Sequence, residues 1–319
     1  MNEESAPTEL VVIGVDGGGS STRVHVADER AHVLFKATGE GSAVKPGQEA
    51  DSAEVIGALV RNAVIDAEMG HLMPRALVVG VAGVGREAQR IALQQELERL
   101  ELADAVVVIS DAEAAMEDAF GEGPGILLIA GTGSIAWGRS PAGTMQRCGG
   151  WGPMIGDEGS GAWLGRKALQ VIAAAHDGRE PETALIGAVL TALEFDDVSA
   201  IISWAATATP ADLASLAPAV LSAAEVGDLR ANTVVTMAVE ELALHVRALA
   251  RSLFVDERAA IPVALHGGLL GKGRPMRKRL EHRLKTLVPG SVVRHQTVDA
   301  ARGAVQMALR TIGLAIEAP

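Results

Sequence analysis

Leu10-Val-Val-Ile-Gly-Val-Asp16-Gly-Gly-Gly-Ser20-Ser-Thr22 is an apolar run that ends in one aspartate and a turn of glycine and hydroxyl residues. The β-branched run predicts a strand buried on both faces, and the alternation of residues 22–27 predicts a returning strand. Glycines let backbone N–H groups approach a ligand closely, so the turn is a candidate anion cradle. Asp16 suits a cation that accompanies a polyphosphate, but an ordinary hairpin whose turn N–H groups satisfy Asp16 is an equally good interpretation.

The composition limits the class of protein. A chain of 319 residues predicts one or two domains, and its 48% hydrophobic content is enough for a sizeable core. The formal net charge of −12 argues against nucleic acid or an anionic membrane as the main partner, although a nucleotide needs only local donors. The single Cys148 excludes an intrachain disulfide, and the N-terminal residues do not resemble a signal peptide. We therefore expect a cytoplasmic protein.

Strands and helices alternate in the first part of the chain. After the two opening strands, residues 31–37 predict a third, so the sheet begins as a three-stranded meander. Helices are then expected at 52–69 and 87–100, and buried strands at 76–82 and 105–110. This order predicts an α/β layer with a mixed sheet.

Asp111 follows the strand at 105–110 and precedes a predicted helix at 112–120. Aspartate is a good N-cap residue, which is one interpretation. The other is a carboxylate at the carboxyl end of a sheet strand, where open α/β sheets bind ligands. The position alone slightly favours the N-cap.

A second turn resembles the first. The apolar strand 125–130 runs into Gly131-Thr132-Gly133-Ser134, and a further strand is expected at 135–138. Two such turns could hold one polyphosphate between them, and their joint occurrence is more specific than either alone. Beyond this similarity, no internal repeat is evident in the sequence.

Glycine, tryptophan and acidic residues are densest between Cys148 and Gly165, where Trp151, Asp157 and Trp163 lie. Carboxylates accept hydrogen bonds from sugar hydroxyls, and an aromatic ring covers an apolar sugar face, so this stretch suits a polyol. A glycine loop capping the helix 160–175 is the alternative, with the acids favoured by its N-terminal dipole.

The rest of the chain is largely helical. Amphipathic spacing predicts helices at 184–193, 198–206, 210–225 and 231–254, then a strand at 261–266 that enters Gly267-Gly268. A basic helix at 274–285, a strand at 292–297 and a last helix at 300–316 complete the expectation.

These motifs resemble the sugar-kinase/Hsp70/actin superfamily, and within it the N-acetylglucosamine kinase group of the BadF/BadG/BcrA/BcrD-type ATPase family. The matching segments follow the family order and span residues 10–270: Asp16-Gly-Gly-Gly-Ser-Ser-Thr22, Ser110-Asp111-Ala, Gly131-Thr-Gly-Ser134, Cys148-Gly-Gly-Trp-Gly with Gly156-Asp-Glu-Gly159, and Ala264-Leu-His-Gly267-Gly268-Leu. The resemblance implies an α/β fold of two lobes, each a mixed sheet flanked by helices, with a cleft between them. We expect lobes at 1–118 and 119–299, with the C-terminal helix of residues 300–319 packing on the first lobe.

The resemblance also implies the activity and the site. The expected reaction transfers the γ-phosphoryl group of ATP to the 6-hydroxyl of an amino sugar, with Asp111 as catalytic base and Asp16 holding Mg²⁺. The residues expected to bind ATP are Gly17, Gly18, Gly19, Ser20, Thr22, Gly131, Thr132, Gly133, Gly267 and Gly268. The residues expected to contact the sugar are Ser42, Asp111, Thr132, Ser134, Gly150, Trp151 and Asp157. A homodimer is compatible with this assignment, and no zinc is expected.

One departure leaves the substrate open. Family members that bind N-acetylglucosamine commonly carry Asn in the loop after the third strand, whereas here the loop reads Gly39-Glu-Gly-Ser42-Ala43. Ser42 could substitute, or the substrate could be glucosamine. Two other classes stay open: an ATPase that drives a conformational change in a protein partner, and a sugar sensor without turnover. Such partner ATPases use cysteines to hold an iron–sulfur cluster, and Cys148 alone makes that alternative weak.

Overall fold

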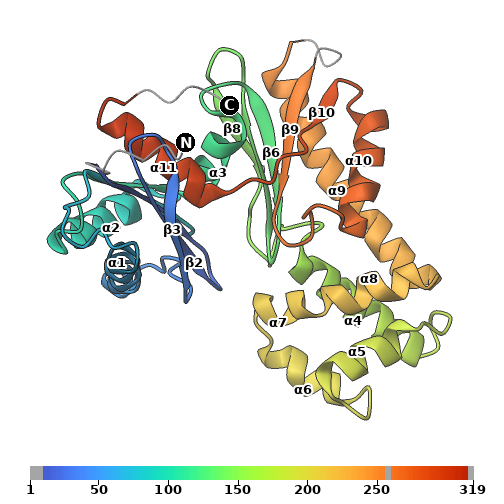
Figure 1. Cartoon of the computed structure of the whole chain (residues 1–319). Coiled ribbons are helices and arrows are strands. Elements are labelled where there is room, and N and C mark those ends of the chain that lie inside the picture. The colour runs from blue at the N-terminus through green and yellow to red at the C-terminus, as the bar shows by residue number, and fades with distance from the viewer. Residues whose placement is uncertain (1–9, 256–259, 315–319) are drawn as a thin grey trace, which may run out of the picture. The chain divides into compact units, whose positions relative to one another are not determined.

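The computed structural model describes residues 10–255 and 260–314, which separate into two compact units (Figure 1). Of the described residues, the first unit holds 10–122 and 298–314, and the second holds 123–255 and 260–297. Each unit contains one five-stranded mixed sheet flanked by helices, which confirms the predicted fold class. Among the helices described, none is long and apolar enough to cross a membrane.

The first sheet has the strand order β3-β2-β1-β4-β5. Its strands β1 (Val12–Gly17), β2 (Thr22–Ala27) and β3 (Val33–Gly39) form the predicted antiparallel meander. The strands β4 (Ala76–Val81) and β5 (Val106–Ser110) run parallel to β1. Every residue of β4 is buried, as the apolar sequence of a central parallel strand requires.

Helices cover both faces of this sheet. The helices α1 (Glu49–Asp66) and α2 (Glu87–Arg99) pack together on one face, and their buried leucine, isoleucine and valine side chains complete one core. The helices α3 (Asp111–Phe120) and α11 (Ala300–Thr311) pack against each other on the other face. The contact is close because a Cβ on Gly303 would lie only 2.0 Å from the Ala114 carbonyl oxygen.

The second sheet repeats the topology of the first. Its order is β10-β9-β6-β7-β8, formed by the strands β6 (Gly125–Ala130), β7 (Ser134–Arg139), β8 (Met145–Gly149), β9 (Ile261–His266) and β10 (Ser291–Val293). The first three in sequence form an antiparallel meander, and β9 and β10 run parallel to β6. Strand β8 was not predicted from the sequence, and β10 is shorter than the predicted 292–297.

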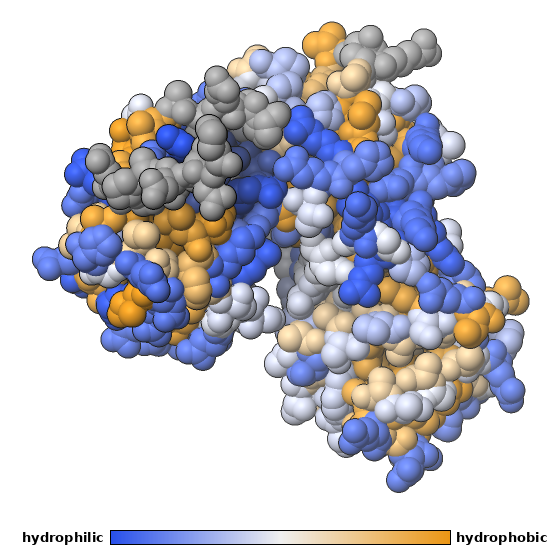
Figure 2. Space-filling view, viewed as in Figure 1, coloured by the Kyte–Doolittle hydropathy of each residue, from blue (hydrophilic) through white to orange (hydrophobic). Residues whose placement is uncertain are grey.

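Seven helices of the second unit are described, and they form a larger helical layer. They are α4 (Gly161–His176), α5 (Leu185–Leu193), α6 (Ala200–Thr207), α7 (Pro210–Ser215), α8 (Ala217–Glu225), α9 (Leu229–Leu253) and α10 (Pro275–Leu287). The prediction of one helix over 210–225 is wrong, because Pro218 in the first turn of α8 lacks the N–H that a continuous helix needs. Apolar residues also reach the surface of this layer (Figure 2). Ile202 of α6, for example, is 74% exposed.

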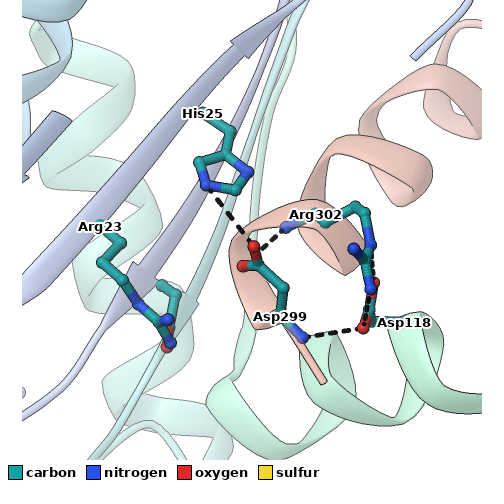
Figure 3. Close-up of polar contacts among 6 residues, drawn as sticks. Arg23, His25, Asp118, Asp299 and Arg302 are labelled. Carbon is teal, nitrogen blue, oxygen red and sulfur yellow. Dashed lines mark hydrogen bonds and ion pairs between the residues drawn. The ribbon is translucent and has the colours of Figure 1, made fainter. Parts of the chain in front are cut away.

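A buried ion-pair network holds α11 to α3 (Figure 3). The Asp118 side chain is only 1% exposed, and its two oxygens accept from Arg302 Nε at 2.5 Å and Nη2 at 2.9 Å. The Asp299 N–H donates to the same carboxylate at 2.8 Å, and Asp299 also caps α11. His25 of β2 lies 3.7 Å from Asp299. These contacts attach the segment that returns from the second unit to the first sheet.

We predict that Arg302→Gln lowers the free energy of unfolding of the first unit by roughly 2–3 kcal/mol at pH 7, because the buried Asp118 charge loses its partner. The expected loss is below that of a fully buried pair because the Arg302 side chain is 36% exposed and solvent screens it. Burial already raises the pKa of Asp118, and a carboxyl with a raised pKa in the folded state contributes most stability while protonated. The difference in unfolding free energy between the variant and the wild type should therefore shrink as the pH falls through that pKa. Urea titrations of both proteins at several pH values measure this difference.

Arg179→Gln is the matched control, because Arg179 pairs with Asp177 on the surface, where both side chains are more than half exposed. Its effect should stay below about 1 kcal/mol. Equal effects of the two variants would contradict the structural role of the network.

Candidate functional site

The strand register of the first sheet places Asp16 and Asp111 at one edge. Gly17 pairs with Val81 of β4, and Val81 pairs with Ser110 of β5. Since β1, β4 and β5 are parallel, their carboxyl ends lie side by side. Asp16 and Asp111 are therefore separated by about two strand spacings, on the order of 10 Å.

Hydrogen bonds from the loop at 39–44 hold the turn after β1 in place. The N–H groups of Ser42 and Ala43 both donate to the Gly18 carbonyl, at 3.0 and 3.1 Å. The Thr22 hydroxyl oxygen lies 2.7 Å from the Glu40 carbonyl and 2.8 Å from the Ser42 hydroxyl. The carbonyl can only accept, so Thr22 donates to it and Ser42 donates to Thr22.

Burial divides the predicted residues of this turn into two groups. Thr22 is fully buried and Ser42 is 2% exposed, so their hydroxyls hold the turn in shape. Gly19 and Ser20 are exposed and Gly18 is half-buried. The groups open to a ligand are therefore the backbone and the Ser20 side chain.

Asp16 has a partner that the sequence analysis missed. Arg23, directly opposite it on β2, donates from Nε at 3.1 Å and from Nη2 to the same oxygen, Oδ2. The interpretation that turn N–H groups satisfy Asp16 is therefore wrong. Within the described residues no hydrogen bond reaches Oδ1 of Asp16, which leaves that oxygen for a cation.

Asp111 is the first residue of α3, and Ser110 is its N-cap. The Ser110 hydroxyl accepts from the Glu113 N–H, while the Glu113 carboxylate accepts from the Ser110 N–H, which completes a capping box. The N-cap interpretation of Asp111 is therefore wrong. Burial, together with the nearby negative charge of Asp16, raises the pKa of Asp111, and one bond from the Ala112 N–H at 2.9 Å opposes this rise.

In the second unit, parallel strands bring two glycine motifs together. Ile129 of β6 pairs with His266 of β9, so the turn at Gly131 and the turn at Gly267 leave the sheet at the same edge. Gly267 has φ +97° and lies so close to β6 that a Cβ would be 2.4 Å from the Ala130 carbonyl oxygen. The Leu269 N–H donates to that same oxygen at 3.2 Å.

The turn Gly131–Ser134 is joined to the start of α4. The N–H groups of Gly161 and Ala162 donate to the carbonyls of Gly131 and Thr132, at 2.8 and 3.1 Å. Ser134 is 3% exposed and its hydroxyl donates to the Glu158 carbonyl at 2.8 Å. These bonds use the carbonyls of the turn and leave Thr132 exposed.

Asp157 links this turn to the glycine-rich loop. Its backbone has φ +60°, a left-handed conformation that aspartate tolerates better than most residues. Burial raises its pKa, while the backbone groups of Ser134 and Gly152 and the charge of Arg166 favour the carboxylate. A Cβ on Gly133 would lie 2.9 Å from the Asp157 carboxylate. The structure therefore brings together the predicted phosphate turn and the predicted sugar carboxylate.

Trp151 lies on the same loop and is 64% exposed. The Gly150 N–H donates to the Ser134 carbonyl at 3.1 Å, which ties the loop to the turn. The predicted residues thus form two groups: Asp16, Gly17–Thr22, Ser42 and Asp111 in the first unit, and Gly131–Ser134, Gly150, Trp151, Asp157, Gly267 and Gly268 in the second.

The family model of the BadF/BadG/BcrA/BcrD ATPase family matches residues 13–308. The chain belongs to this family. The match includes both glycine turns, both aspartates of the first sheet edge and the loop with Trp151. An ATP-using fold therefore accounts for the residues that the two sheets gather at their edges.

Named relatives match over nearly their whole length. The chain is 29% identical over 301 residues to an N-acetylmuramic acid/N-acetylglucosamine kinase of Clostridium acetobutylicum, covering 93% of this chain and 97% of that one. It is 27% identical to a glucosamine kinase of Vibrio cholerae, covering 93% and 95%. A solved structure from Chromobacterium violaceum, named as a candidate N-acetylglucosamine kinase, is 34% identical with a TM-score of 0.78 and coverage of 95% and 100%.

We predict that Asp111→Asn stabilises the first unit at neutral pH. The carboxyl has a pKa raised above its ordinary value of 3.8 by burial, so its protonated form stabilises the fold, and this contribution is lost as the pH rises through the raised pKa. Asparagine has no charge to bury, so the gain should be small at acid pH and grow towards neutral pH. Thermal melts from acid to neutral pH measure it.

Asp104→Asn is the control, because Asp104 is 47% exposed and pairs with Arg75 on the surface. That variant should show no such stabilisation. A destabilised Asp111→Asn at neutral pH would mean that the charge of Asp111 serves the fold.

Proposed function

We propose that this chain is an ATP-dependent kinase that transfers the γ-phosphoryl group to the 6-hydroxyl of an amino sugar, with N-acetylglucosamine as the first substrate. The relatives named above are kinases of amino sugars, and they match the chain along nearly its full length. The chain also has the residue types that such a reaction needs, and they lie at a sheet edge or on the loop between β8 and α4.

The observation that carries the proposal is the empty space beside three glycines. A Cβ on Gly19, Gly131 or Gly268 would meet no atom within 4 Å, and none of the three has a positive φ. The fold itself therefore does not need glycine there. A ligand that lies against the backbone does, and phosphate groups bind such exposed N–H groups. Neighbouring Gly267 differs, because its backbone is left-handed and crowded.

Asp111 is the proposed catalytic base. In phosphoryl transfer most of the catalysis comes from positioning and electrostatics, and the carboxylate orients the attacking hydroxyl and takes up its proton. Within the described residues the Asp111 carboxylate accepts only from backbone, from the Ala112 N–H at 2.9 Å and from its own N–H, so its remaining lone pairs can accept from a hydroxyl. Because the pKa of Asp111 is raised, the activity should begin to fall at a higher pH than it would with an exposed carboxylate as the base.

Asp16 is the proposed Mg²⁺ ligand. Mg²⁺ is commonly held by one or two carboxylates together with water and substrate phosphates, and Oδ1 of Asp16 is available for this. The mutual repulsion of Asp16 and Asp111 also favours a cation at this edge. The ion would neutralise charge on the β- and γ-phosphate oxygens. Arg23 holds the carboxylate in orientation through the other oxygen.

Asp157 and Trp151 are proposed to bind the sugar. Asp157 can accept from sugar hydroxyls with the lone pairs that its backbone donors leave unused, and the exposed Trp151 ring can cover an apolar sugar face. Ser42 is a weak substitute for the missing Asn, because it is 2% exposed and donates to Thr22. This observation favours glucosamine as the second candidate substrate.

We predict that Gly131→Ala and Gly268→Ala leave the melting temperature unchanged, since the added methyl meets no protein atom. Each should raise the KM for ATP by about tenfold, which corresponds to about 1.4 kcal/mol of lost binding, and leave the KM for the sugar near that of the wild type. Gly267→Ala is the contrasting variant and should destabilise the fold. Unchanged ATP kinetics in both open-space variants would contradict nucleotide binding at these turns.

The experiment that tests the function is an assay of ADP release with Mg²⁺-ATP over a panel of hexoses, hexosamines and N-acetylhexosamines. The rate should depend on an amino sugar and be highest with N-acetylglucosamine, and Asp111→Asn should lower kcat by about 10²–10⁴-fold. A rate indifferent to every sugar would instead favour an ATPase that acts on a protein partner.

A further inference from the structure

Arg147, in the middle of β8, carries a guanidinium group that is held in place while some of its N–H groups stay without a partner among the described residues. Its Nη1 donates to the carbonyls of Gly149 and Gly150, at 3.0 and 3.1 Å. The guanidinium carbon lies 4.8 Å from the centre of the Trp151 ring, which is stacking distance. Two carbonyls and one ring therefore fix the orientation of an exposed side chain.

The other donors of Arg147 have no partner among the described residues. Nε and Nη2 make no hydrogen bond there, and no described carboxylate pairs with this arginine. This is unexpected in a chain with a net charge of −12, in which many arginines bind a neighbouring acid. A fixed guanidinium with two free N–H-bearing nitrogens has the fork geometry that binds carboxylates.

This free fork lies beside the proposed sugar site. Trp151 is in contact with Gly156, since a Cβ there would lie 2.8 Å from the Trp151 Cβ, and Asp157 follows directly. The backbone of Gly152, next to Trp151, interacts with the Asp157 carboxylate. Contacts along one loop thus link Arg147 to Trp151 and Trp151 to the residues beside Asp157. Trp151 stays 64% exposed with Arg147 stacked on it, so ring surface remains for a sugar.

We propose that Arg147, positioned by Trp151, is a specificity residue for an acidic substituent on the sugar. The substrate class then extends from neutral amino sugars to those that carry a carboxylate. This inference rests on the proposed function, because it places the subsite next to the sugar that Asp157 binds. The carboxylate binds Nε and Nη2 through two parallel charge-assisted hydrogen bonds, and the transferred phosphoryl group and its acceptor hydroxyl are unaffected.

Three sugars separate charge from size: N-acetylglucosamine, its neutral 3-O-methyl ether, and N-acetylmuramic acid, which bears a carboxylate on a 3-O-lactyl group. Wild-type protein should phosphorylate N-acetylmuramic acid with a kcat/KM at least equal to that of the methyl ether. Arg147→Gln should lower kcat/KM for N-acetylmuramic acid by about 10- to 100-fold, the range for charge-assisted hydrogen bonds. The kcat/KM for each of the two neutral sugars should change by less than about threefold.

Two further variants define the mechanism. Arg147→Lys keeps the charge but loses the fork, so it should recover only part of the activity on N-acetylmuramic acid. Lys167→Gln is the control, because Lys167 also stacks on a tryptophan, 5.4 Å from the ring of the buried Trp163. It removes a cation from an equivalent ring contact and should leave the ratio between the sugars unchanged.

The inference is overturned if Arg147→Gln lowers kcat/KM equally for all three sugars. It is also overturned if the variant raises the KM for ATP, because Arg147 would then contact the nucleotide. It is also overturned if the wild type accepts only the neutral sugars. If no sugar releases ADP, the proposed function fails, and titration calorimetry with N-acetylmuramic acid then decides about Arg147. The subsite is supported if the wild type binds N-acetylmuramic acid and Arg147→Gln binds it more weakly. It is rejected if both proteins bind this sugar equally or neither binds it.

Discussion

The register of parallel strands is the constraint on which both groups of candidate residues depend, one in each unit. In the first sheet the pairing of β1, β4 and β5 places the ends of three strands in one row, with Asp16 at one end and Asp111 at the other. In the second sheet the pairing of β6 and β9 does the same for the turns at Gly131 and Gly267. Buried apolar strands leave polar groups only at their ends, so function concentrates at these edges. The same topology in both units repeats this arrangement.

This arrangement lowers the stability of the fold because it buries carboxylates. Asp111 and Asp157 both have pKa values raised by burial, and Asp157 also adopts a left-handed backbone. Neither pairs with a cation at hydrogen-bond distance within the described residues. By contrast Asp118, which serves the fold, binds Arg302 through both oxygens. Buried acids that lack such a partner mark sites where stability is given up for reactivity.

Much of the fold could be predicted from the sequence, because its strands are strongly apolar and end in glycine turns. Strand β8 was missed because Met145–Gly149 is polar and mostly exposed, so it carries no hydrophobic pattern. The break between α7 and α8 followed from Pro218, which the amphipathic spacing of 210–225 concealed. The repeated topology of the two sheets is absent from the sequence because different side chains can fill equivalent strand positions.

The chemistry of the site was only partly predictable. The glycine turns and Asp111 stand out as motifs, but whether Asp111 caps α3 depends on Ser110 and Glu113, whose capping box becomes clear only with the helix start. Arg23 could have been found, since a hairpin with its turn at 18–21 pairs it with Asp16. Arg147 could not, because its role comes from carbonyls and a ring that the loop brings together.

The central claim is that the γ-phosphoryl group of ATP reaches the 6-hydroxyl of an amino sugar. Phosphorus–proton correlation NMR of the product formed from N-acetylglucosamine and Mg²⁺-ATP tests it most directly, because it identifies the carbon that carries the new ester. The account predicts a phosphorus signal coupled to the two protons on C6. Inorganic phosphate as the sole product, or coupling to any other sugar proton, would contradict it.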